Sequence, residues 1–205
     1  MSRADPPTLV EASSAGDAAE FAARAMRFGP DALVRVRPAG DGTGRLWTVL
    51  PFRVLACRTV ATSFTEDATV RAADLRRPPG SAEIPARHDG GWRTTLPASD
   101  GEVVEVIPGP ELARLDRAAA ETLRSRRGQG IGDRRLRDAL LDHVAVTVVA
   151  GDVEHEVPLR LVVGLLRMGL HDPAEPARVR LSGRRVGLEG TRGSVWPLEA
   201  GLRVL

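Results

Sequence analysis

Residues 144–168 read VAVTVVAGDVEHEVPLRLVVGLLRM, and this stretch decides the fold of the second half of the chain. Residues 144–150 and 153–157 are two valine-rich runs joined by Gly151-Asp152. A two-residue connection with glycine first favours a type II′ turn, so the sequence predicts a β-hairpin. Pro158 then begins a helix that ends at Met168-Gly169. Apolar residues surround almost its whole circumference, which predicts a helix central to its domain.

The hairpin turn also fixes which side chains share a face, because side chains alternate along a strand. One face is expected to be apolar and to hold Val146, Val148, Ala150, Val153, His155 and Val157. The opposite face is expected to meet water and to hold Thr147, Val149, Glu154 and Glu156.

The elements on either side of this stretch complete one module. Before it, the sequence predicts a helix over 111–127, in which Leu112, Leu115, Ala119 and Leu123 point inward, and a second helix from Asp133 to about His143. After it, residues 177–181, 185–188 and 195–198 predict a meander of short strands.

The first half of the chain predicts one helix against a mostly antiparallel sheet. Asp17 and Glu20 have the spacing of a capping box, and Gly29-Pro30 ends the helix. Glycine- and proline-rich turns separate the strand-like segments that follow: 32–37, 45–50, 52–61, 69–71, 92–96 and 102–107. Residues 25–29 followed by 34–36 faintly resemble 165–169 followed by 179–181, so an internal duplication is one hypothesis.

Pro108-Gly109-Pro110 is the best candidate for a domain boundary. We therefore expect an α+β protein of two small modules, each a mostly antiparallel sheet or meander supported by one to three helices. The expected divisions are a flexible leader over 1–14, an N-terminal module over 15–107 and a C-terminal module over 111–205.

Composition excludes several classes of protein. The apolar runs are too short to span a bilayer, and the N-terminus lacks the apolar region of a secretion signal, so we expect a cytoplasmic protein with no membrane partner. A single cysteine, Cys57, excludes an intramolecular disulfide framework. All 29 basic residues are arginine, and the chain has no Lys, Asn or Tyr. This bias is typical of a GC-rich genome, so the abundance of arginine alone does not indicate a nucleic-acid partner.

No motif for catalysis, metal or cofactor binding stands out. No two histidines have the spacing of a metal site, and no nucleophile elbow is present. Cys57 lies in an apolar strand and is expected to be a buried, inert thiol. An enzyme would require a cleft that brings groups such as His143 and His155 together. We therefore expect no cofactor and no metal, and an enzyme is not the favoured class.

Two arginine sets are less neutralised by carboxylates than the arginines of the helices predicted over 111–127 and 133–143. Arg160 and Arg167 flank Gly164 on one stripe of the apolar helix, and Arg178 and Arg180 project from one strand face. Arg126 and Arg127 precede a glycine-rich loop over 126–133 that could present N–H groups to a phosphate, although a plain helix–helix connection explains the same residues. The candidate anion- or partner-binding residues are Arg160, Arg167, Arg178, Arg180, Arg126 and Arg127.

The predicted function is a non-enzymatic interaction or regulatory module that binds another protein or a second copy of itself. One alternative is a nucleic-acid-associated regulator that uses the arginine-rich helix 133–143 and the hairpin 177–188. A second alternative is a small-molecule- or phosphate-binding protein that uses loop 126–133.

Overall fold

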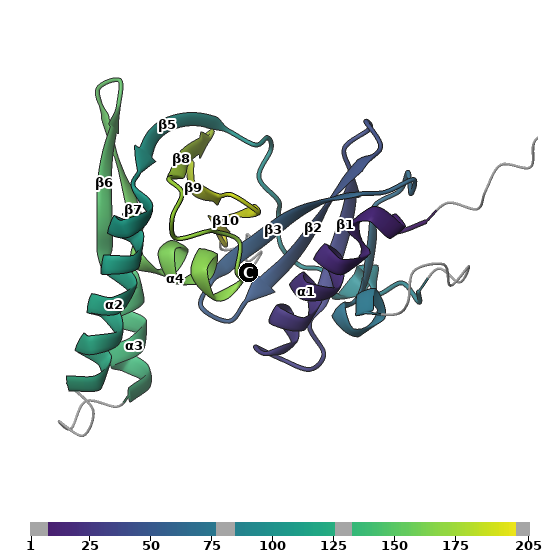
Figure 1. Cartoon of the computed structure of the whole chain (residues 1–205), viewed down its shortest axis with the longest axis horizontal. Coiled ribbons are helices and arrows are strands. Elements are labelled where there is room, and N and C mark those ends of the chain that lie inside the picture. The colour runs from purple at the N-terminus through teal and green to yellow at the C-terminus, as the bar shows by residue number, and fades with distance from the viewer. Residues whose placement is uncertain (1–7, 77–84, 126–132, 200–205) are drawn as a thin grey trace, which may run out of the picture. The chain divides into compact units, whose positions relative to one another are not determined.

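A computed structural model describes residues 8–76, 85–125 and 133–199 of the chain. The chain forms two compact units (Figure 1). Apart from terminal residues, unit 1 runs to Leu50 and from Leu55 to Thr94, and unit 2 contains Pro51–Val54 and Thr95–Glu199. Antiparallel strands dominate, with few helices, so the predicted α+β class and two-module layout are confirmed.

Unit 1 is a helix packed on a four-stranded sheet of order β4-β1-β2-β3. The helix buries Phe21, Ala22 and Ala25, three of the residues that its sequence places on one stripe. The regular elements are α1 (Ala15–Met26), β1 (Leu33–Pro38), β2 (Thr43–Leu50), β3 (Val54–Ala61) and β4 (Ala68–Arg71), with 3-10 turns at Ala12–Ser14, Ala72–Arg76 and Asp89–Gly91.

The predicted capping box in unit 1 is wrong. The helix begins at Ala15, and Asp17 lies in its first turn rather than at its N-cap. The Asp17 carboxylate instead pairs with Arg58 of β3 at 2.6 Å, and Glu20 reaches the same guanidinium at 3.5 Å. Because only 6% of the Arg58 side chain is exposed, the two carboxylates neutralise a buried charge and hold the helix to the sheet.

The structure also corrects two strand predictions in the first half of the chain. The strand expected over 52–61 begins at Val54, because Arg53 has a positive φ of 64° that an extended strand cannot contain. Residues 92–96 form no strand, and Trp92 donates its indole N–H to the Thr94 carbonyl in a local turn. Cys57 is buried, as predicted.

Unit 2 contains a sheet of order β10-β9-β8-β5, a separate hairpin and three helices. Helix α4 lies against β9 and β10, and Gly164 lets it approach Val54 so closely that a Cβ there would lie 3.1 Å from the valine. The elements are β5 (Glu102–Ile107), α2 (Gly109–Ser125), α3 (Asp133–Asp142), β6 (Val144–Ala150), β7 (Val153–Pro158), α4 (Leu159–Arg167), β8 (Ala177–Ser182), β9 (Arg185–Gly190) and β10 (Gly193–Pro197).

The hairpin prediction is confirmed together with its register. Val148 pairs with His155 and Ala150 with Val153, and Gly151 has a φ of 61°. The predicted central helix is also confirmed, since Leu159, Leu161, Val162, Gly164 and Leu165 are all buried.

Arg185 fastens both ends of the segment 95–199 to the sheet of unit 2. Only 8% of this side chain is accessible. Its guanidinium donates to the carbonyl and the hydroxyl of Thr95, at 3.2 and 2.7 Å, and forms an ion pair with Glu199. This contact lowers the pKa of Glu199.

The two units share one arrangement. In each, a helix leads into three consecutive strands, and a fourth strand pairs with the first of them on its outer side: β4 with β1, and β5 with β8. The two copies of the faint sequence repeat occupy equivalent places. Residues 25–29 and 165–169 begin in the last turns of α1 and α4, and residues 34–36 and 179–181 lie within β1 and β8.

Candidate functional site

Arg160 secures helix α4 to the turn at residues 51–54. Its Nη1 donates to the Phe52 carbonyl at 2.9 Å, and its guanidinium pairs with Asp142 at the end of α3. Burial, assisted by the charge of Arg53, lowers the pKa of Arg160. Arg167, at the other end of the predicted stripe, is exposed. The glycine between these arginines packs on Val54, so the stripe is partly covered.

Arg178 and Arg180 lie side by side on one face of β8, as the sequence predicts. Both pair with Glu189 of the neighbouring strand β9: Arg180 Nε lies 2.8 Å from the carboxylate, and Arg178 Nη1 lies 4.0 Å from it. Arg180 also donates to the Gly101 carbonyl at 2.9 Å. The carboxylate thus balances one of the two charges, and the Arg178 side chain stays 52% exposed.

Strand β5 adds two valines to the same face. Val106 is the register partner of Arg178, and Val103 is the register partner of Arg180, so each pair projects from the same side of the sheet. The valines are 49% and 41% exposed. We call the surface formed by Val103, Val106, Arg178, Arg180 and Glu189 the valine–arginine face. Apolar side chains beside guanidinium groups are typical of protein–protein interfaces.

The remaining predicted anion sites offer less. Arg126, Arg127 and all of loop 126–133 except Asp133 lie outside the described residues, as do the side chains of 133–135. In the second predicted nucleic-acid element, hairpin 177–188, the burial of Arg185 removes one guanidinium from the surface.

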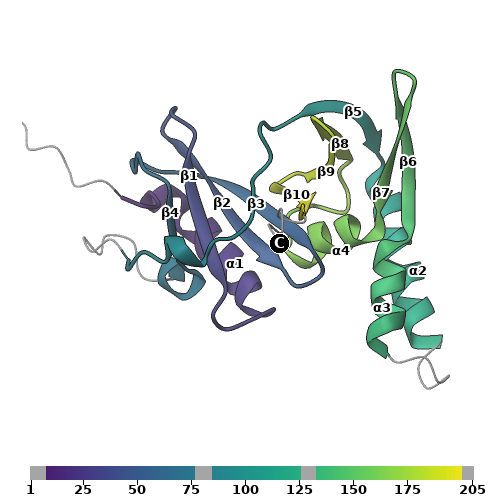
Figure 2. The ribbon, with the colours of Figure 1, turned by 180° about the vertical axis from the view of Figure 1, so that it is seen from behind.

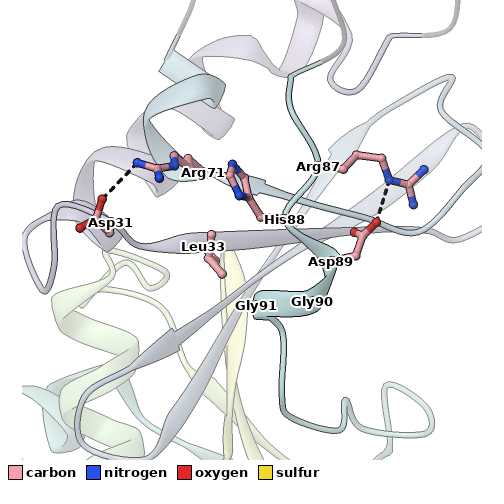
Figure 3. A pocket seen from close by; sticks show the side chains of 8 residues that line it. All are labelled: Asp31, Leu33, Arg71, Arg87, His88, Asp89, Gly90 and Gly91. Carbon is pink, nitrogen blue, oxygen red and sulfur yellow. Dashed lines mark hydrogen bonds and ion pairs between the residues drawn. The ribbon is translucent and has the colours of Figure 1, made fainter.

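A cavity of about 330 Å³ opens on unit 1, lined by Asp31, Leu33, Arg71, Arg87, His88, Asp89, Gly90 and Gly91. Figure 3 shows His88 between two ion pairs, Arg71–Asp31 and Arg87–Asp89. Asp89 also accepts a hydrogen bond from Thr69 N–H at 2.7 Å, which is the main reason that its pKa is lowered. Because each cation in the cavity already faces a carboxylate, the cavity has no excess positive charge for an anion.

A second cleft, of about 300 Å³, lies between α2, α3 and the start of β6 in unit 2. Among its lining residues, only Thr122 and His143 have polar side chains, and the others are leucine, alanine and valine. This lining lacks the convergent polar groups that a catalytic or phosphate site requires. The valine–arginine face is therefore the best candidate site.

Comparison with protein families supports two modules in the chain. Residues 96–202, just over half of the sequence, match the family model described as "Domain of unknown function (DUF8185)". The chain belongs to the DUF8185 family. Residues 5–99 match a second model, "Domain of unknown function (DUF8010)". A search of curated proteins gives no match.

Solved structures show which fold the DUF8185 chain adopts. It is similar to the DNA polymerase III subunit beta of Pseudomonas aeruginosa, with a TM-score of 0.60 and 12% identity over 94% of this chain and 64% of that one. Caulobacter crescentus pol III beta has a TM-score of 0.57 and 12% identity over 95% of this chain and 66% of that one. The beta clamp of H. pylori has a TM-score of 0.57 and 9% identity over 96% of this chain and 64% of that one. The chain thus spans just under two thirds of the length of these proteins, and its fold resembles that of a sliding clamp.

The sequence identified Arg178 and Arg180 but not the two valines beside them. The signal that could have found the valines is the spacing of Glu102 and Glu105 in β5. Residues three apart point to opposite faces of a regular strand, so a charged residue on each face indicates that water reaches both faces. Only the pairing of β5 with β8 shows that they join the arginines.

Proposed function

We propose that this DUF8185 protein is a non-enzymatic interaction module that binds a protein partner through the valine–arginine face. The observation that carries the proposal is the cross-strand pairing of two half-exposed valines with two arginines. The described residues contain five exposed large hydrophobic side chains, and two of them lie on this face. Clustering distinguishes an interaction surface from the single exposed valines of any protein.

The way the edge of β5 is protected favours contact through side chains rather than addition of a strand. The register of β5 shifts between Val103 and Glu105, and the Glu105 carboxylate accepts a hydrogen bond from Val106 N–H at 2.8 Å. Irregular register and glutamates along an outer strand both discourage pairing with another chain. A partner is therefore expected to meet the face of the sheet.

Cross-linked capture from the native host tests this proposal. We expect Val106→Asp to reduce the recovered partner about tenfold or more, because a carboxylate would be buried in the interface. Val49→Asp is the matched control, since Val49 of unit 1 is exposed to a similar extent, 41%. Equal recovery with both variants would refute the assignment.

A second candidate function is association with DNA. One of the structurally similar proteins is named as a DNA polymerase sliding clamp. In this chain, the exposed guanidinium of Arg178 is the group that would contact a phosphate. Duplex binding measured by fluorescence anisotropy should then weaken as salt increases, and Arg178→Ala should lower the slope of log K against log salt by about 1. Undetectable binding at low salt removes this candidate.

A further inference from the structure

Among the described residues, unit 2 contains a segment that has no counterpart in unit 1. In unit 1, the helix and the strands follow one another directly. In unit 2, residues 109–158, which form α2, α3, β6 and β7, separate the outer strand β5 from helix α4. The shared sheet arrangement is complete without this segment, so those of its side chains that stay exposed are available for a different task.

The β6–β7 hairpin has one partly buried face and an apolar tip. Val148 and Val157 lie on the same face of the hairpin, and both are buried. At the tip, Val149 and Val153 are 63% and 56% exposed, the highest values among the exposed large hydrophobic side chains of the described residues. The register places them on opposite faces, since Val149 pairs with Glu154 and Val153 with Ala150. Figures 1 and 2 both show the hairpin extending away from α2 and α3.

The charge of the hairpin defines the chemistry of its partner. Residues 144–158 contain Asp152, Glu154 and Glu156 and no basic residue other than His155. Three carboxylates around an apolar tip repel nucleic-acid phosphates and attract lysine and arginine side chains.

We propose that the β6–β7 hairpin inserts Val149 and Val153 into an apolar pocket of a protein partner whose rim carries arginine or lysine. Asp152, Glu154 and Glu156 then face those cations. This inference rests on the proposed role as a protein-interaction module, but it uses residues outside the valine–arginine face.

Photo-crosslinking with the full-length protein tests the inference in the native host. A benzophenone amino acid replaces Val149 in one variant, Val106 in a second and Val49 in a control. We expect crosslinks from position 149, but not from position 49, to a protein peptide that adjoins both apolar and basic residues. Crosslinks from position 149 to nucleic acid, to a second copy of this chain or to an acidic surface, or no crosslink at all, would overturn the inference.

Binding of the purified partner that position 149 identifies provides the second measurement. Val149→Thr combined with Val153→Thr keeps the β-branched shape and should weaken binding about tenfold or more. Glu154→Arg should also weaken binding of the partner, and the loss should be larger at low salt than at high salt. Glu102→Arg on β5 should have little effect. Unchanged affinity in both hairpin variants would also overturn the inference. Crosslinks from position 106 without any from 149 would leave the proposed function intact, whereas no protein crosslink from either position contradicts both.

Discussion

The ion-pair cluster at Arg58 predicts an unequal response to removal of its two sides. The guanidinium is buried, whereas the carboxylates that pair with it, Asp17 and Glu20, are 56% and 39% exposed. Combining Asp17→Asn with Glu20→Gln leaves a buried positive charge without a counter-charge. Loss of one partner of a fully buried pair costs about 3–5 kcal/mol, and solvent screening of these carboxylates reduces our expectation to about 2 kcal/mol.

The reverse change should cost less. Arg58→Met retains an unbranched side chain of similar length in the same space, and the two carboxylates it leaves behind are already hydrated. We expect a loss of about 1 kcal/mol or less. For a chain of this size, the double variant should lower Tm by roughly 4–8 °C, and Arg58→Met by about half of that or less.

Thermal unfolding followed by circular dichroism at neutral pH distinguishes the two cases. Arg24→Met is a suitable control, because Arg24 pairs with Glu20 one turn away on the helix surface and should change stability by no more than about 0.5 kcal/mol. The reasoning is refuted if Arg58→Met destabilises the protein as much as the double variant does.

Two further predictions concern stability. Gly187→Ala should lower the free energy of unfolding in urea by about 1–3 kcal/mol, because the added Cβ would lie 2.6 Å from the ring of the buried Trp196. Gly16→Ala in helix α1 should raise it by up to about 1 kcal/mol, because the added Cβ meets no packed atom within 4 Å. Equal effects of the two substitutions would contradict this packing. Burial lowers the pKa of His171 below its ordinary value of 6.5, and neither ring nitrogen has a hydrogen-bond partner, so the unfolded chain takes up the proton more readily. Stability should therefore be lost as pH falls below 6.5, and His171→Leu should lose less over the same range; parallel urea midpoints against pH in the two proteins would disprove the role of His171.

The sequence was most informative where local rules set the geometry. The two-residue turn at Gly151-Asp152 determined both strands of the hairpin and the face on which each of their side chains lies. The sequence also identified α4 as buried, because the apolar residues around the whole circumference of a helix can be recognised from that helix alone.

Sequence reasoning failed where a distant residue supplied the partner. Asp17 has the spacing of a helix cap, but Arg58 of β3 is the group it neutralises. Arg185 follows a glycine turn, which favours exposure, yet Thr95 and Glu199 enclose it. In the candidate site, alternation placed Arg178 and Arg180 on one face, but the valines beside them belong to a strand far away in sequence.

The Arg185 contacts have a practical consequence for dividing the protein. A fragment that starts at residue 96, where the DUF8185 match begins, lacks Thr95 and so leaves two guanidinium donors inside the fold without acceptors. A fragment that ends before residue 199 removes the balancing carboxylate. Isolated pieces of this half should therefore be cut outside 95–199, and a piece trimmed to the homology boundary is expected to be less soluble and more easily digested by proteases.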